Sequence, residues 1–267
     1  MKIGFLITAR LKSNRLPFKI LKDLNGRTVI ERIIDRARNI VDISEIILCT
    51  SVNPQDKPLI DIAKKNDIYY YNGGQEDVLQ RLMEAARLFS LDYFLGITAD
   101  NPLFSIHYSN LIVDEIKRNG YDFVKLKGLP LGCSTYGMKV KALETVCKIK
   151  NVVDTEIWGP LIDRPEIFDI KTMEIPGTRP DLRLTLDYQE DYELISHLYK
   201  TLNYNTVLSL QDVIEYLRKN PEAGNINAKC EQLELSSQEL HKIDKYYSES
   251  RKEIMKIKEA IYMVNKS

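Results

Sequence analysis

The chain has 267 residues, of which 44% are hydrophobic and 28% charged, as is typical of a folded protein with one large domain, alone or with a smaller appendage. Basic and acidic residues both number 38, so the formal net charge is zero, which argues against bulk binding of nucleic acid. No apolar stretch has the length of a membrane span. The four cysteines form no C-x-x-C pair, so we expect a cytoplasmic protein without a zinc site or disulfide framework.

The first hundred residues alternate between short β-rich runs and helical patterns. Strands are predicted over 2–8, 45–51, 68–72 and 93–98, with helices over 28–40, 54–66 and 76–90 between them. This alternation predicts an α/β fold with a doubly wound, mostly parallel sheet. Ligands of such sheets bind at the carboxyl ends of the strands. We therefore expect one rim to collect the loops that follow Ile7, Thr50, Tyr71 and Thr98.

The second half of the chain has a more mixed pattern. Strands or extended segments are predicted over 121–126, 134–138, 168–175 and 182–187, and helices over 140–150 and 188–202. Ser236 and Glu239 have the spacing of a capping box, and apolar residues then recur at helical spacing as far as Ile261. We expect an α/β domain over 1–227 and a helical C-terminal extension over 228–267, docked on the body or on a second copy.

The loop after the first predicted strand, "ARLKSNRLPFK" (9–19), is densely cationic. It matches neither a Walker loop nor a G-x-G-x-x-G fingerprint. Ser13 and the backbone N–H groups of a tight turn can hold phosphate oxygens, and Arg10 and Lys19 can reach the same anion. The pattern favours an anion site over the alternative, a solvated surface turn.

Two aspartates stand near the predicted rim. Asp100 follows a buried strand and could bind Mg²⁺, which favours carboxylates together with substrate phosphates, or could serve as a turn or helix N-cap residue. In "LRLTLD" (182–187), period two places Arg183, Thr185 and Asp187 on one face, which indicates a strand that lines a site. N-capping of the next helix is the alternative for Asp187, and the following "QED" is typical of first-turn dipole complementation.

The stretch "NGGQEDVLQR" (72–81) joins a predicted strand to a helix through two glycines. Gly73 and Gly74 permit close backbone approach, and Gln75 and Glu76 could hydrogen-bond a base. The alternative is that the acidic residues only favour the start of the helix.

Taken together, these stretches resemble a known family. "ITARLKSNRLPFKIL" resembles the R-x-x-S-x-R-L-P-x-K signature of cytidylyltransferases that make CMP-activated sugars, including the CMP-Kdo and CMP-sialate synthetases. "NGGQEDVLQRLMEAA", "ITADNPLF" and "RPDLRLTLDYQEDYELI" resemble the spore-coat polysaccharide branch in order and spacing. The resemblance spans about residues 1–220 and implies a Rossmann-like nucleotide-diphospho-sugar transferase fold.

The resemblance also implies roles for single residues. Arg10, Ser13, Arg15 and Lys19 would hold the triphosphate of CTP, with Arg10 and Lys19 neutralising the charge that grows during reaction. Gly74 and Gln75 would lie near the cytosine and ribose, and Asp100 and Asp187 would coordinate Mg²⁺. Arg183 could meet an acceptor carboxylate or phosphate, or serve as a salt-bridge partner.

The sequence departs from the family pattern mainly in its middle. Phe18 replaces the glycine before Lys19, "GCSTYGM" (132–138) lacks the usual acids, and "TEIWG" (155–159) stands for Arg-Glu-His-Val. We therefore expect a Mg²⁺-dependent enzyme, often dimeric in this family, that transfers CMP from CTP to an altered sugar-like acceptor for surface polysaccharide or glycan biosynthesis and releases pyrophosphate. The alternatives are a glycosyltransferase that uses a sugar nucleotide, and a non-catalytic nucleotide-binding homologue.

Overall fold

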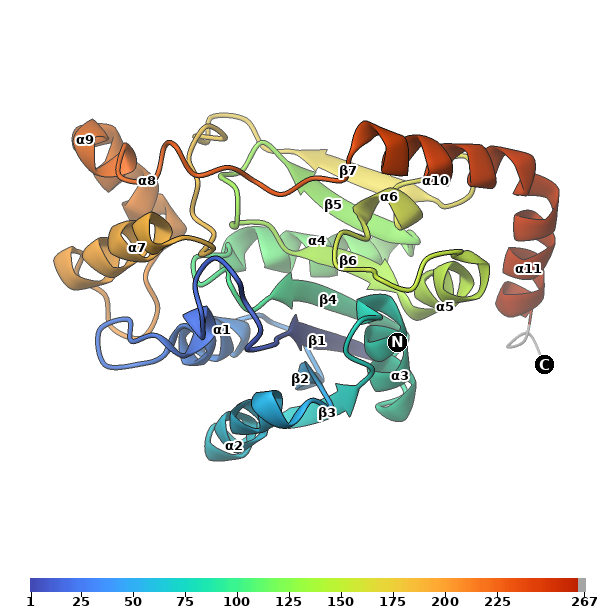
Figure 1. The fold of residues 1–267 in the computed structure, drawn as a ribbon, viewed down its shortest axis with the longest axis horizontal. Coiled ribbons are helices and arrows are strands. Elements are labelled where there is room, and N and C mark those ends of the chain that lie inside the picture. Colours follow the sequence, from blue (N-terminus) through green and yellow to red (C-terminus); the bar gives the residue numbers. More distant parts are fainter. Residues whose placement is uncertain (264–267) are drawn as a thin grey trace.

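The computed structural model describes residues 1–263, which form a seven-stranded sheet covered by helices on both faces (Figure 1). The strands are β1 (Ile3–Thr8), β2 (Glu45–Ser51), β3 (Tyr69–Gly73), β4 (Tyr93–Thr98), β5 (Phe123–Lys127), β6 (Tyr136–Lys139) and β7 (Ile170–Glu174). Their order in the sheet is β3-β2-β1-β4-β6-β5-β7. The predicted doubly wound, mostly parallel sheet is confirmed.

Helices connect most of these strands. They are α1 (Val29–Ala37), α2 (Lys57–Lys65), α3 (Val78–Leu88), α4 (Ile106–Asn119), α5 (Val140–Ile149), α6 (Gly159–Ile162), α7 (Gln189–Thr201), α8 (Leu210–Lys219), α9 (Pro221–Gly224), α10 (Ser237–Glu249) and α11 (Arg251–Met263), with 3₁₀ turns η1 (Lys19–Leu21) and η2 (Pro54–Asp56). Among these helices, α4, α6, α8 and α9 were not predicted from the sequence.

Parallel pairing brings the ends of the first four strands level. Strand β1 pairs with β2 on one side and β4 on the other, and Thr8 stands opposite both Cys49 and Thr98. Strand β3 continues the sheet beyond β2. The loops that follow these strands therefore share one rim, as expected, and we call this the carboxyl rim.

Strand β6 is the one antiparallel member of the sheet within residues 1–263, since it runs against both β4 and β5. It ends at the opposite, amino edge, where the Val140 backbone N–H donates to the Asp92 carbonyl at 2.9 Å. Helix α5 starts there and runs back toward the carboxyl rim. Lys150, just after α5, forms an ion pair with Asp77 at the start of α3. The segment that follows α5 is thus delivered to the carboxyl rim.

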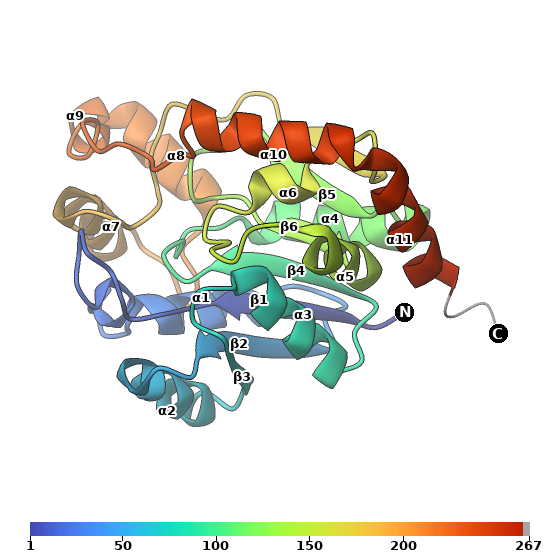
Figure 2. The same cartoon turned by 45° about the vertical axis from the view of Figure 1, so that its right-hand side comes forward.

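Two hydrophobic layers sandwich the sheet. One layer packs α1, α4, α7 and α8 against it through buried side chains such as Ile33, Ile112 and Leu194. The other contains α3, α5, α6 and the C-terminal helices, with Leu82 and Leu143 among its buried residues, and Figure 2 shows these helices in front of the sheet. Burial on both faces is what the near-continuous apolar strands require.

The C-terminal extension is a helix pair that packs on this second layer. The predicted capping box is confirmed, because Ser236 and Glu239 exchange hydrogen bonds at the start of α10. Ile243, Tyr247 and Ile254 are buried against the body. The last four residues of the predicted extension lie outside the described residues, and the division at 227/228 stays a prediction. No helix within residues 1–263 is both long and apolar enough to cross a membrane.

The expected strand over 182–187 is wrong. The segment makes a single bridge, between Leu131 and Arg183, and its leucines and polar residues are all buried. Its backbone bonds run instead to two loops: the Leu184 N–H donates to the Leu131 carbonyl at 2.8 Å, and the Leu186 N–H donates to the Asp100 carbonyl at 2.8 Å. The alternation of apolar and polar residues over 182–187 therefore does not mark a strand with one solvated face. Its polar side chains are buried, and Arg183 and Asp187 form an ion pair.

Candidate active site

The loop between β1 and α1 is fixed by its apolar residues. Leu11 and Leu16 are buried in the core, and the Leu11 backbone N–H donates to the buried Asp56 carboxylate at 2.7 Å. The Ser13 hydroxyl accepts from the Leu16 N–H at 3.4 Å, within the loop itself. With these residues held in place, the cationic side chains of the loop are presented at the carboxyl rim.

Lys19 lies between the two aspartates predicted to act together. Its Nζ is 2.7 Å from Asp100 Oδ2 and 2.7 Å from Asp187 Oδ1. Burial alone would lower the pKa of Lys19, but the two carboxylates outweigh it and raise that pKa above its ordinary value. Burial likewise tends to raise the pKa of Asp100, yet Lys19 and the Thr98 hydroxyl lower it on balance. Lys19 and Asp100 are therefore both charged at neutral pH.

The backbone explains how residues 87 positions apart meet. Asp100 stands two residues beyond the end of β4. The bond from the Leu186 N–H to the Asp100 carbonyl draws the 182–187 segment alongside this turn. Asp187, the next residue, is thereby set beside Asp100. The family resemblance paired these two aspartates, and the structure brings them side by side, although Asp187 does not follow a strand.

Arg15 joins the same cluster. Its Nη2 is 2.8 Å from Asp187 Oδ1, and its guanidinium carbon lies 4.9 Å from the centre of the Tyr188 ring. Arg15, Lys19, Asp100 and Asp187 thus form one group, which we call the Lys19 cluster. The cluster places two cations and two carboxylates at the carboxyl ends of the parallel strands.

A second, buried layer of charges supports Asp187. Arg183 Nη2 donates to Asp187 Oδ2 at 2.8 Å, and its Nε donates to Asp191 Oδ1 at 2.9 Å. Asp191 is fully buried and accepts the backbone N–H of Asp187 at 2.8 Å and of Tyr188 at 3.0 Å. Arg183 is therefore engaged as a salt-bridge partner, and acceptor binding by Arg183 stays a prediction.

The N-capping alternative for Asp187 is wrong, because Tyr188 is the N-cap of α7. Asp191 in the first turn accepts the backbone N–H groups of Asp187 and Tyr188, just before the helix. Asp191 does more than complement the helix dipole, since it also holds Arg183. Asp191 is the third residue of α7. An acidic residue at this position often bonds back to the residue that caps the helix, and this pattern could have identified Asp191 from the sequence.

Arg10 lies on the carboxyl rim but outside the Lys19 cluster. Its Nη2 forms an ion pair with Glu156 Oε2 at 2.5 Å. Glu156 belongs to the segment after α5, which Thr155 fastens to the start of α3 by a 3.1 Å bond to Asp77 Oδ1. No sequence pattern indicated Glu156 as a partner of Arg10.

The glycine turn after β3 contains the remaining predicted residues. Arg81 Nη1 donates to the Gly74 carbonyl at 2.6 Å and to the Gln75 carbonyl at 3.3 Å. The Gln75 side chain accepts from Asn53 at 2.7 Å. Apart from the residues flanking Gly74, no atom lies within 4 Å of a Cβ placed on it. Asp77 caps α3 by accepting the Gln80 N–H. This agrees with the alternative that the acidic residues of this turn favour the start of the helix. The turn thus has an open backbone that could admit a ligand.

The Lys19 cluster has the chemistry of a magnesium site that uses substrate oxygens. Asp100 and Asp187 already face one cation from two sides. Among residues 1–263 no group of three or more His, Cys, Asp and Glu side chains could hold a metal ion. Mg²⁺ commonly binds through one or two carboxylates plus phosphates and water, so these two aspartates fit it as a pair that a nucleotide would complete.

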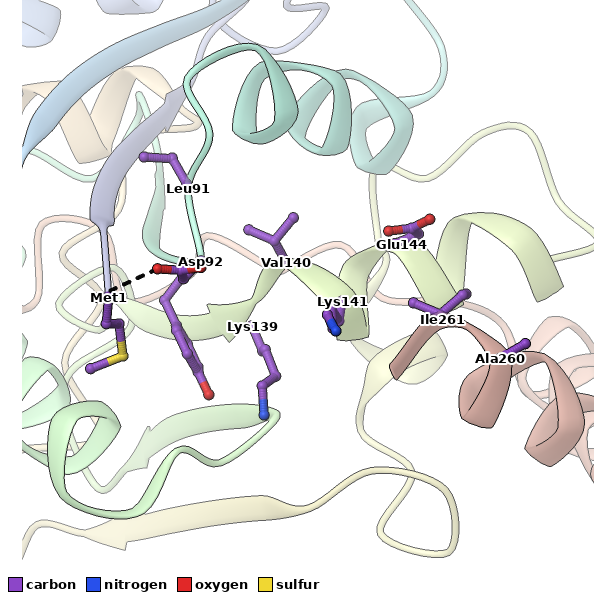
Figure 3. Close-up of a pocket in the computed structure, with 10 residues that line it drawn as sticks. Met1, Leu91, Asp92, Lys139, Val140, Lys141, Glu144, Ala260 and Ile261 are labelled. Atoms are coloured by element: carbon purple, nitrogen blue, oxygen red, sulfur yellow. Dashed lines mark ion pairs between the residues drawn. The ribbon is translucent and has the colours of Figure 1, made fainter. Parts of the chain in front are cut away.

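A separate cavity of about 660 Å³ opens at the amino edge of the sheet, between Met1, α5 and α11 (Figure 3). Its charged groups already have partners: Met1 pairs with Asp92, and Lys141 donates to the Tyr262 carbonyl at 3.1 Å. This cavity is at the edge opposite the predicted site residues and gathers none of them.

Comparison with known proteins identifies the family to which the chain is similar. A family model described as cytidylyltransferase matches residues 5–212. The chain is 31% identical to an uncharacterized protein of Methanocaldococcus jannaschii, over 87% of this chain and 97% of that one.

The chain is also 25% identical to the spore coat polysaccharide biosynthesis protein SpsF of Bacillus subtilis, over 83% of this chain and 96% of that one. The structure of a cytidylyltransferase from Leptospira borgpetersenii superposes with a TM-score of 0.79 at 24% identity, covering 88% of this chain and all of that one, which shows a shared fold. The resemblance drawn from the opening signature is confirmed, and the chain belongs to the cytidylyltransferase family.

Proposed function

We propose that this protein transfers CMP from CTP to a sugar-like acceptor with release of pyrophosphate. The observation that carries the proposal is the convergence of Lys19 with Asp100 and Asp187 from separate loops, with Lys19 Nζ 2.7 Å from an oxygen of each carboxylate. A cation between two carboxylates at the ends of parallel strands suits an enzyme that must hold and neutralise a phosphate chain.

In the proposed reaction an acceptor oxygen attacks the α-phosphorus of CTP in line, and the bond from that phosphorus to the pyrophosphate oxygen breaks. Lys19 and Arg15 bind the phosphate oxygens and stabilise the charge that develops on them. Asp100 and Asp187 would hold Mg²⁺, which would supply Lewis-acid stabilisation of the negative charge on the phosphate chain. Arg183 and Asp191 keep the Asp187 carboxylate oriented.

Arg10 and the glycine turn would serve the rest of the nucleotide. Arg10 would bind the triphosphate once it leaves Glu156. Gly74 and Gln75, whose carbonyls Arg81 fixes, would lie against the cytosine and ribose. The similarity to a spore coat polysaccharide biosynthesis protein supports a sugar acceptor and a role in making surface polysaccharide.

The proposal includes Mg²⁺ dependence, a cytoplasmic location and a homodimer. The two-carboxylate arrangement supports the metal, and four free cysteines among the described residues are consistent with a reducing compartment. The dimer rests on the family resemblance. Light scattering after size-exclusion chromatography would measure the oligomeric state.

The test is a pyrophosphate-release screen of each nucleoside triphosphate against acidic sugars, sugar phosphates and small phosphorylated acceptors, with Mg²⁺ and with EDTA. We expect release from CTP with at least one acceptor and none with EDTA. A glycosyltransferase would instead consume a finished sugar nucleotide without releasing pyrophosphate. A non-catalytic homologue would bind CTP in calorimetry and release nothing with any acceptor.

A further inference from the structure

A buried asparagine lies in the segment that leads from α9 to α10. We call residues 225–235 the return segment, and Figure 1 shows it running from α9 on one side of the molecule toward α10 on the other. Asn227 is only 2% exposed, while its neighbours Asn225, Ile226 and Ala228 are exposed. A polar side chain buried alone in an otherwise exposed segment must satisfy its hydrogen-bonding groups inside the protein.

The Asn227 amide donates to two partners that belong to the support of the active site. Its Nδ2 is 3.0 Å from the Arg183 carbonyl oxygen and 2.7 Å from Asp191 Oδ1. Both hydrogens of the amide group are therefore used. One bond fixes the backbone at Arg183, and the other completes the shell around a fully buried carboxylate.

That carboxylate controls the position of Asp187. Asp191 holds the Asp187 backbone N–H directly at 2.8 Å, and it holds Arg183, whose Nη2 donates to Asp187 Oδ2. With Oδ2 bound to Arg183, the Oδ1 atom of Asp187 faces Lys19 and Arg15. Removing one donor from a buried, fully bonded carboxylate weakens the network that orients it.

We infer that Asn227 is a positioning residue for the transfer reaction, acting through Asp191 and Arg183 on the Asp187 carboxylate. The inference rests on the proposed function and extends it to a residue beyond the family match, which ends at residue 212. The return segment is then a part of the catalytic centre as well as a connection to α10 and α11. Gln232 in the same segment accepts from Arg183 Nη1 at 3.1 Å, a second contact with the same guanidinium.

The experiment compares Asn227→Ala and Asn227→Asp with the wild-type enzyme, with Asn225→Ala as an exposed control from the same segment. Pyrophosphate release from CTP is measured well below each variant's melting temperature, together with CTP affinity by calorimetry. We expect kcat to fall about 10- to 100-fold in Asn227→Ala, the range for partners that orient a ligand-binding side chain. KM and the Kd for CTP should stay within about threefold, because Arg15 and Lys19 are retained.

The Asn227→Asp variant keeps the volume of the side chain. It tests the role of Asn227 if Asn227→Ala does not fold. Its carboxylate would face the Asp191 carboxylate and the Arg183 carbonyl where a donor is needed, so kcat should fall at least as far as in Asn227→Ala. If either folded variant keeps the wild-type kcat and only its melting temperature is lower, Asn227 is merely structural and the inference is wrong. Failure of the wild-type enzyme to release pyrophosphate would overturn the proposed function instead, so the two failures are distinguishable.

Discussion

Arg10, two residues after β1, and Glu156, after α5, form an ion pair across the carboxyl rim, with Nη2 and Oε2 2.5 Å apart. Arg10 is the cation that, by the family resemblance, would bind the triphosphate, and in this structure it binds Glu156 instead. Since the Glu156 side chain is 62% exposed, the pair contributes little to stability, about 0–1 kcal/mol. In the proposed function, nucleotide binding therefore breaks this weak ion pair as Arg10 turns to the phosphate.

The first prediction is that Glu156→Gln lowers KM for CTP. Removing the carboxylate frees Arg10, and a gain of up to about 1 kcal/mol corresponds to a decrease of about two- to fivefold. Steady-state pyrophosphate release measures the change. Glu174→Gln, which breaks a comparably exposed pair with Lys127, is the control and should leave KM unchanged. A higher KM would mean that Glu156 helps to bind substrate.

The second prediction concerns Asp100→Asn. The substitution keeps the shape of the side chain and the bonds to the Thr98 region, but it removes one of the two carboxylates that face Lys19. We expect kcat to fall about 100- to 1000-fold, as for the loss of a group that stabilises transition-state charge. Circular dichroism should show an intact fold. The exposed Asp181→Asn is the matched control, and full activity of Asp100→Asn would refute the assignment.

The third prediction is a pH dependence of stability centred on Glu31 in α1. Burial tends to raise the pKa of this carboxyl, but hydrogen bonds from the Thr28 backbone and side chain, Lys65 and Asn66 lower it from 4.5 to about 2. Because the folded-state pKa is depressed, the stabilisation is present above about pH 4.5 and is lost as the pH falls toward 2. Glu31→Gln should cost about 2 kcal/mol near pH 7 and progressively less below pH 4.5.

Urea unfolding of both proteins at several pH values between about 3 and 7 measures this difference. The two free-energy curves should converge on the acid side. A difference that stays constant with pH would show that Glu31 stabilises α1 through packing and not through its charge.

The fourth prediction is that the contact of α11 with Asp122 stabilises the fold and has little effect on catalysis. Asp122 is buried at the amino edge and accepts from Lys258 Nζ at 2.8 Å and from the Tyr262 hydroxyl at 2.7 Å. Asp122→Asn leaves Lys258 without its buried counter-charge and should cost about 3 kcal/mol of unfolding free energy. Because this cluster is at the edge opposite the Lys19 cluster, kcat should stay within about twofold.

Urea unfolding and pyrophosphate release report the two effects independently. The exposed Asp61→Asn is the control for loss of a surface carboxylate and should change neither quantity. A parallel loss of kcat in Asp122→Asn would show that the tail helices reach the active site through the sheet.

The fold was predictable where hydrophobic burial dictates the local pattern. Strands β1, β2 and β4 are buried on both faces and appear in the sequence as continuous apolar runs. Helix α4 was missed although Ser105 caps it and Gly120 ends it in a left-handed conformation. The 182–187 segment misled because buried ion pairs gave it the alternation of a half-exposed strand.

The site could be predicted from the sequence for residues whose position depends only on their own loop. Lys19, Asp100 and Asp187 could be identified from their places after predicted elements, and they meet. Phe18, which replaces the expected glycine, keeps a left-handed backbone with φ of 53°, so the turn before Lys19 retains a glycine-like shape. The Arg10–Glu156 pair could not be predicted, because it depends on the reversed direction of β6.

Because β6 runs antiparallel to its neighbours, the length of α5 sets the distance from the amino edge of the sheet to the segment that contains Glu156. The helix begins at the far edge of the sheet and ends at the rim, so adding or deleting one turn would displace Thr155 and Glu156 by about 5 Å along their approach. The loops that hold Lys19, Asp100 and Asp187 arise from other elements and would not move with it. A change in the length of α5 would therefore alter how Glu156 approaches Arg10 and leave the Lys19 cluster in place.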